Sequence, residues 1–135
     1  MRVLQDSLWI AIGGALGTLG RYWIAEAFSG WFGSGFPWGT VFINVTGSFV
    51  IGFFGTLTGP DGRVFVSTVT RQFVMIGLCG GYTTFSSFSL QTLSMAQKGE
   101  WSIAGLHVIG SVVLCLLGVW AGAIAAAALN QLKGA

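Results

Sequence analysis

The chain has 135 residues, of which six are Lys or Arg and four are Asp or Glu, 7% in all. A soluble globular domain carries roughly 25% charged residues, so this composition excludes a soluble enzyme, a nucleic-acid-binding protein and a disordered segment. Hydrophobic residues make up 53%, and the formal net charge is only +2. A helix needs roughly 20 apolar residues to span a bilayer, so the length fits four spans in one transmembrane domain covering residues 1–135.

Four apolar segments follow one another along the chain. A Gly-rich connection follows the first, the turn Thr58-Gly59-Pro60-Asp61-Gly62 follows the second, and a short polar loop follows the third. We therefore expect an all-α membrane protein with four transmembrane helices. The third helix is expected to break at mid-membrane, where Gly80-Gly81 interrupts it. The expected spans cover residues 3–28, 38–57, 65–96 and 101–129.

The positive charges give only a weak preference for one orientation in the membrane. With four spans both ends of the chain lie on one side, which collects four cationic residues, whereas the other side collects Arg21 and Lys98. This balance permits insertion in both orientations and therefore an antiparallel, dual-topology homodimer. A four-helix monomer is also too thin to enclose a polar pathway. The four cationic residues on the first side are Arg2, Arg63, Arg71 and Lys133.

Glycine is unusually frequent, with 22 of 135 residues against an average near 7%. Three pairs of glycines are spaced four residues apart, which lets helix backbones approach closely inside a membrane. We expect helix contacts at these pairs, which are Gly13 with Gly17, Gly77 with Gly81, and Gly118 with Gly122.

Polar residues within the second and fourth spans mark possible linings of a pathway. Asn44 and Ser48 share one face of the second span. The Asn44 amide offers two N–H donors to an anion, or joins helices by hydrogen bonding. In the fourth span, His107, Ser111 and Cys115 follow at four-residue steps. We interpret His107 as a structural or interfacial residue and Cys115 as a small hydrophobe, and we expect Ser111 to line the pathway.

The strongest signal is the run of hydroxyl residues after Gly80-Gly81 in the third span. Broken backbone at membrane depth is tolerated only where it is buried or lines a cavity, and it exposes carbonyl groups that bind cations. The carbonyls near Gly80 and Thr83 are candidates for a small hard cation. Phe85 and Phe88 share a helix face and either pack in the core or line a pathway. Ring edges are electropositive and, with hydroxyl donors, can solvate an anion without any fixed charge.

No carboxylate lies in the middle of a span. Proton-coupled pumps usually need an intramembrane carboxylate relay, and no nucleophile or phosphate-binding motif of an enzyme is present. We therefore expect a passive, uncharged pathway and no enzyme. The four carboxylates, all near span ends or in loops, are Asp6, Glu26, Asp61 and Glu100.

The segments Gly13–Tyr22, Gly39–Ser48 and Gly77–Phe88, together with the four-span length, resemble the Fluc (CrcB) family of fluoride ion channels. The resemblance covers essentially the whole chain. It implies a fluoride-selective passive channel that exports cytoplasmic fluoride and so protects against fluoride toxicity. It also implies an antiparallel, dual-topology homodimer with two pores, each built from both subunits.

The resemblance also implies roles for individual residues. The backbone carbonyls of Gly80 and Thr83 match positions that hold a structural sodium ion at the dimer centre, two oxygens from each subunit. Phe85 and Phe88 match the pair whose ring edges line the fluoride path. The other matches are Asn44, Thr84, Ser86 and, more loosely, Ser111 along the path, and Arg21 near the aqueous vestibule.

The partners expected on this basis are fluoride, a second copy of the chain and the lipid bilayer, without nucleic acid, in a multi-pass protein of the bacterial inner cell membrane. The alternative is a small four-span multidrug or cation antiporter. Such proteins use a mid-membrane Glu in the first span, where this chain has only Asp6 near the start and Glu26 near the end. An accessory subunit without transport activity is a third reading, but it has little reason to carry polar residues at mid-membrane.

Overall fold

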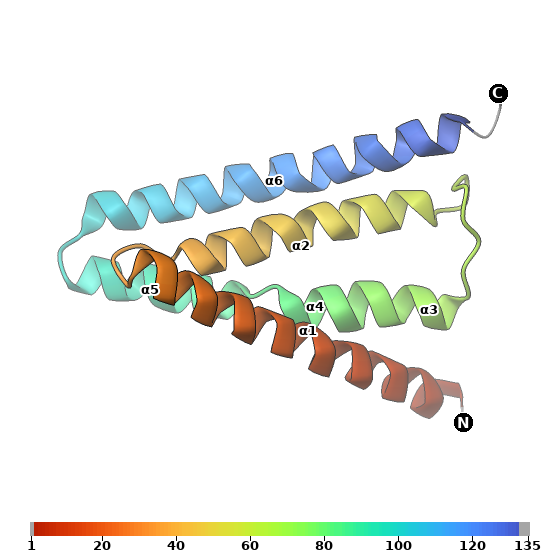
Figure 1. Ribbon diagram of the computed structural model, residues 1–135, viewed down its shortest axis with the longest axis horizontal. Helices are drawn as coiled ribbons and strands as arrows, with labels where there is room; N and C mark the ends of the chain where they lie inside the picture. Colours follow the sequence, from red (N-terminus) through yellow and green to blue (C-terminus); the bar gives the residue numbers. More distant parts are fainter. Residues whose placement is uncertain (1, 133–135) are drawn as a thin grey trace.

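The computed structural model describes residues 2–132, and this part of the chain is helical without any strand. Four passes run alternately back and forth, so both ends of the chain lie at the same end of the bundle (Figure 1). Helices α3, η1, α4 and α5 together form the third pass. The helices are α1 (Arg2–Phe32), α2 (Trp38–Leu57), α3 (Thr68–Gln72), the π-helical η1 (Phe73–Cys79), α4 (Gly80–Tyr82), α5 (Phe85–Gln97) and α6 (Trp101–Gln131).

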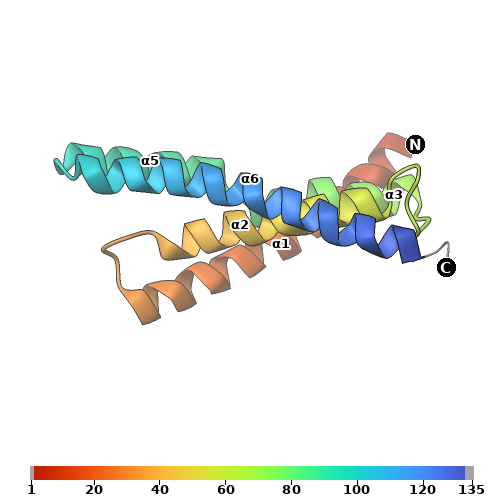
Figure 2. The ribbon, with the colours of Figure 1, turned by 90° about the horizontal axis from the view of Figure 1, so that it is seen from above.

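Helices α2 and α6 lie side by side along most of their length (Figures 1 and 2). Their close approach depends on small residues of α6. A Cβ atom added at Gly118 would lie 2.9 Å from the carbonyl oxygen of Val45, and one at Gly122 would lie 2.8 Å from the backbone nitrogen of Phe53. The predicted helix contact at this glycine pair is therefore confirmed.

Helix α1 packs against the third pass through glycines on both sides. A Cβ atom at Gly77 would lie 3.1 Å from the Cα atom of Gly13, and one at Gly81 would lie 2.9 Å from the Cα atom of Gly14. The glycine spacing on each helix thus predicted a real contact. The two backbones are close enough to touch because neither side chain extends beyond hydrogen.

The third pass breaks two residues later than expected. Gly80 and Gly81 lie within α4, and the helical conformation is lost at Thr83 (ψ 158°) and Thr84 (φ −151°, ψ 114°). Helix α5 then begins with Thr84 as its N-cap, whose hydroxyl accepts a hydrogen bond from the Ser87 N–H. The glycines support helix packing, whereas the threonines, with their polar side chains, form the break.

Three helical segments of the described chain are long and apolar enough to cross a membrane: Trp38–Leu57, Thr68–Gln97 and Trp101–Gln131. Helix α1 has 31 residues but is not among them. The first of the four expected spans therefore stays a prediction. Among the cationic residues counted for orientation, Lys133 lies outside the described residues.

At the end of the bundle away from the termini, α5 and α6 splay apart from α1 and α2 (Figure 2). A cavity of about 450 Å³ lies at this end, lined by the α1–α2 connection, α5 and the α5–α6 turn. Its polar lining includes Thr40, Gln91, Lys98 and Glu100. This second cavity is distinct from the one around the helix break.

Candidate ion pathway

A cavity of about 400 Å³ surrounds the break in the third pass and extends between that pass, α2 and α6. Its lining combines hydroxyl, amide, thiol, aromatic and aliphatic groups, and none of its residues is Asp, Glu, Lys or Arg. An ion that enters it meets hydrogen-bonding groups and backbone dipoles, but no fixed charge. The predicted site residues among its lining are Asn44, Gly80, Thr83, Thr84, Phe85, Phe88 and Ser111.

The Asn44 side chain clamps the break from α2. Its Nδ2 atom donates to the carbonyl oxygen of Thr84 at 3.0 Å, and its Oδ1 atom accepts from the Thr84 N–H at 2.8 Å. Both main-chain groups of Thr84 are thus satisfied by one side chain, as buried polar groups require. Only one N–H of the amide is left for an anion, rather than the two expected from the sequence.

The same hydrogen bonds release two carbonyl groups of the third pass. In a continuous α-helix the N–H of residue i bonds to the carbonyl of residue i−4, so Thr84 would bond to Gly80 and Ser87 to Thr83. Instead, the Thr84 N–H bonds to Asn44 and the Ser87 N–H bonds to the Thr84 hydroxyl at 3.1 Å. The carbonyls of Gly80 and Thr83 therefore lose the partners that a continuous helix would give them.

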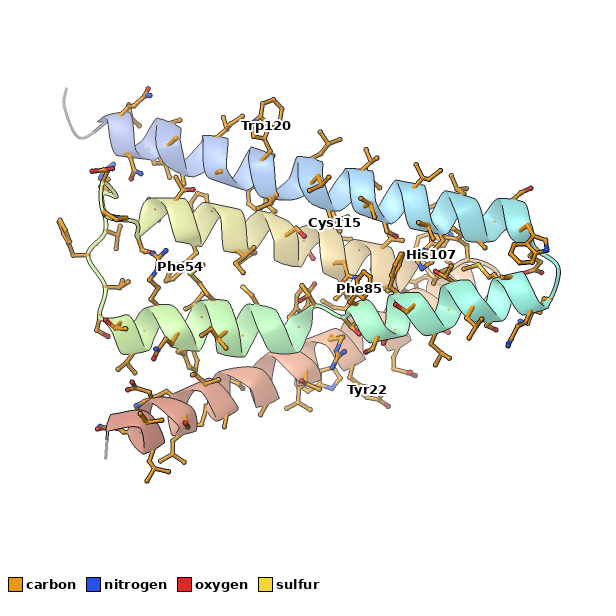
Figure 3. The ribbon with its side chains drawn as sticks, turned by 180° about the vertical axis from the view of Figure 1, so that it is seen from behind. Tyr22, Phe54, Phe85, His107, Cys115 and Trp120 are labelled. Carbon is orange, nitrogen blue, oxygen red and sulfur yellow. The ribbon has the colours of Figure 1, made fainter. Side chains whose placement is uncertain are left out.

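Phe85 and Phe88 lie together at the start of α5. Their ring centroids are 5.2 Å apart with an interplanar angle of 43°. Phe88 is buried, with 8% of its surface exposed, whereas Phe85 is 77% exposed. Phe85 faces the side of α6 that carries Cys115 and His107 (Figure 3). Core packing within one chain therefore explains Phe88 but not Phe85.

Hydroxyl groups gather around the start of α5. The Thr84 hydroxyl donates to Ser87 Oγ at 3.0 Å and lies 3.3 Å from Ser86 Oγ. In the described chain, the N–H groups of Phe85 and Ser86 have no hydrogen-bond partner, as is usual for the first turn of a helix. The break thus presents both backbone donors and side-chain hydroxyls near the ring of Phe85.

The polar stripe of α6 meets the cavity at two points. Ser111, which is 5% exposed, and Cys115 both line it, whereas Ser111 alone was expected there. His107 was expected to be structural or interfacial, but it is fully buried and its Nε2 atom has no hydrogen-bond partner among the described residues. Helical spacing placed these residues on one face, but only the packed structure reveals the unpaired nitrogen.

Arg21 lies away from the cavity at the break, whereas two residues of η1 that were not predicted line it. Arg21 is partly exposed on α1 and is not among the residues that line either cavity described above, so this chain alone does not bring it to the break. Met75 and Cys79 of η1 do line the cavity at the break, and sequence reasoning missed them because apolar residues in an apolar span carry no signal.

The described residues contain no group of three or more His, Cys, Asp or Glu side chains that could hold a metal ion. The oxygen atoms that the break leaves without a helical partner are the backbone carbonyls described above. Small hard cations bind such oxygen ligands, so the donor chemistry of the released Gly80 and Thr83 carbonyls fits sodium.

Residues 8–123 match the family described as CrcB-like protein, Camphor Resistance (CrcB). The chain is 57% identical over 127 residues to the "Fluoride-specific ion channel FluC" of Opitutus terrae, covering 94% of this chain and 96% of the relative. It is 58% identical over 131 residues to the protein of the same name from Methylocella silvestris, covering 97% and 100%. The relative of that name from Rhodospirillum rubrum is 57% identical over 124 residues, covering 92% and 96%. The chain belongs to the CrcB family.

Proposed function

We propose that this chain is a fluoride-specific passive ion channel of the cell membrane. The relatives named above carry that name at 57–58% identity over nearly their full length. The observation that carries the proposal in this chain is the uncharged cavity at the Thr83–Thr84 break. The antiporter alternative would require a mid-membrane Glu in the first span, whose carboxylates are Asp6 near its start and Glu26 near its end.

The chemistry of the cavity suits fluoride. Fluoride is small, strongly hydrated and a strong hydrogen-bond acceptor, so a selective path must replace its water with well-placed donors. Such contacts come from the Ser111 hydroxyl, the remaining N–H of Asn44 and the electropositive ring edges of Phe85 and Phe88. The Thr84 hydroxyl already donates to Ser87 Oγ, and Ser86 lies beside the path, outside the cavity lining. Chloride is larger and gains less from these donors, so a narrow path of this composition favours fluoride.

The working unit is an antiparallel homodimer of four-span subunits. Phe85 is 77% exposed although it stands beside the cavity, and a second copy would cover it and close the open side of the path. Arg63 and Arg71 stand at one end of the bundle, whereas Lys98 stands at the other (Figure 1). This weak asymmetry allows both orientations under the positive-inside rule. In this dimer, helix α1 is the remaining membrane span of each subunit, and Arg21 lies near the vestibule.

A sodium ion at the dimer centre would hold the two breaks together. The Gly80 and Thr83 carbonyls are released from helical bonding because Asn44 and the Thr84 hydroxyl take their N–H partners. The preceding helical run ends at the break, and the carbonyl end of a helix carries partial negative charge. Two such carbonyls from each subunit would give the ion four oxygen ligands.

The phenylalanine pair gives the sharpest test of this pathway. In liposomes loaded with potassium fluoride, Phe85→Ile or Phe88→Ile should slow fluoride efflux at least about tenfold, equivalent to about 1.4 kcal/mol, because an aliphatic chain lacks an electropositive edge. Phe32→Ile, at the exposed end of α1, is the matched control and should conduct normally. Normal efflux from both Phe85→Ile and Phe88→Ile would rule out the assigned path.

A further inference from the structure

His107 is a buried polar residue that the proposed pathway does not explain. It lies on α6 between Cys115 and the α5–α6 turn (Figure 3), and its side chain is fully buried. Its Nδ1 atom lies 3.4 Å from Ser111 Oγ, and its Nε2 atom has no partner among the described residues. Leaving a buried polar atom unpaired costs free energy, so the filling of space alone does not explain a histidine at this position.

The ring of His107 separates the two cavities. On one side it packs against Phe88 with ring centroids 4.9 Å apart, and Phe88 and Ser111 line the cavity at the break. On the other side it meets Phe36 edge-on at 5.5 Å, and Phe36 lines the polar cavity at the splayed end. His107 thus contacts residues of both cavities, and any change in its charge acts on both.

The hydrogen bond between His107 and Ser111 has two directions. In the neutral tautomer that carries its proton on Nε2, Nδ1 accepts the Ser111 hydroxyl proton, and that proton is then unavailable to an anion. When the imidazole is doubly protonated, Nδ1–H donates to Ser111 Oγ, and the hydroxyl proton is free to turn into the cavity. Protonation of this tautomer therefore converts Ser111 from a donor engaged with the ring into a donor available to fluoride.

No fixed charge near His107 competes with an anion for interaction with the protonated ring. The helices packed against α6 are α2 and α5, and neither contains an ionisable residue. On α6 the only other ionisable side chain is Cys115, eight residues away. Lys98 and Glu100, in the turn before α6, line the far cavity and carry opposite charges. An anion in the cavity at the break is thus the natural counter-charge of a protonated His107.

We propose that protonation of His107 turns the Ser111 hydroxyl toward the cavity and raises fluoride conduction, so that the channel is activated by acid. This inference rests on the proposed fluoride channel and adds its regulation. By thermodynamic linkage, fluoride in the cavity and a proton on His107 each strengthen the binding of the other. Imidazole is the side chain whose charge ordinarily changes between about pH 5 and 8, so the test below covers that interval.

Fluoride currents across planar bilayers test the switch, because neutral hydrogen fluoride carries no current. With equal pH on both sides, we expect the current at pH 5 to be at least about threefold that at pH 8, an interval that brackets the ordinary pKa of imidazole. His107→Gln and Ser111→Ala should each remove this rise. Ser102→Ala, at the exposed start of α6, should retain it. A pH-independent wild-type current, or an unchanged rise in His107→Gln, would overturn the switch.

A second measurement needs no variant. Addition of potassium fluoride to lightly buffered, purified wild-type protein near pH 6 should cause uptake of protons beyond that of a protein-free control, whereas potassium chloride should not. Equal uptake with fluoride and chloride would contradict the linkage. Absence of fluoride current at every pH would instead overturn the proposed function itself, so the two failures are distinguishable.

Discussion

At the scale of single residues, Asn44 organises the break. Its amide satisfies both main-chain groups of Thr84, and this arrangement leaves the Gly80 carbonyl without its helical donor. The sequence marked Asn44 as unusual, because a polar side chain in an apolar span needs a partner. It could not identify that partner, because the partner is backbone forty residues later in the chain.

Asn44→Ala should destabilise the protein more than loss of an ordinary polar contact. Two main-chain groups of Thr84 would lose their partners, and each unsatisfied group costs about 1–3 kcal/mol. Asn44→Asp should lie between alanine and wild type, because a carboxylate can accept from the Thr84 N–H but cannot donate to the carbonyl. The measurement is the thermal unfolding midpoint in detergent.

The control for Asn44 is Thr92→Ala, which removes a hydroxyl bonded only to the Phe88 carbonyl of its own helix. That carbonyl keeps its place in the helix, so the midpoint should change little. Equal midpoints for Asn44→Ala and Thr92→Ala would contradict the clamp.

At the scale of the helices, glycine spacing predicted contacts better than it predicted the break. The pairs on α1 and on the third pass meet each other, as the four-residue spacing indicated. Gly80-Gly81 was expected to interrupt the helix but lies inside it. Glycine permits a break without requiring one, and here the side-chain bonds of Thr84 and Asn44 decide its position.

A matched pair of alanine substitutions tests the α1 contact. A Cβ atom at Gly77 would lie 2.8 Å from the carbonyl oxygen of Ile10, whereas one at Gly105 meets no atom within 4 Å. Gly77→Ala should therefore destabilise the protein by about 1–3 kcal/mol through overpacking. Gly105→Ala should be neutral or stabilise by about 0.5–1 kcal/mol, because alanine favours the helix. Chemical unfolding in mixed micelles would measure both, and equal effects would argue against close backbone contact.

At the scale of the whole molecule, composition and apolar segments predicted an all-helical membrane protein. Three helices among the described residues are long and apolar enough to span a membrane, in agreement with this prediction. Hydrophobic length is a strong signal because the bilayer fixes it. The sequence alone could not predict how the cavity is closed, because Phe85 is exposed on a single chain. In the proposed homodimer a second copy covers Phe85, and no local sequence pattern encodes that contact.

Sodium removal tests the assembly. If the Gly80 and Thr83 carbonyls of two subunits hold one sodium ion, replacing sodium with N-methyl-D-glucamine during purification should lower the proportion of dimers, measured by light scattering in detergent. Restoring sodium should recover the dimer, whereas potassium at the same ionic strength should recover less. A proportion of dimers that does not change with sodium would contradict a sodium ion at the dimer centre.

The central claim is selective, passive conduction of fluoride, and ion efflux from liposomes tests it most directly. Purified protein would be reconstituted into vesicles loaded with potassium fluoride or potassium chloride, and a potassium ionophore would start electrogenic efflux, followed with ion-selective electrodes. Fluoride should be released rapidly, and chloride release should not exceed that from protein-free vesicles. Folded protein that releases neither ion, or both equally, would contradict this claim.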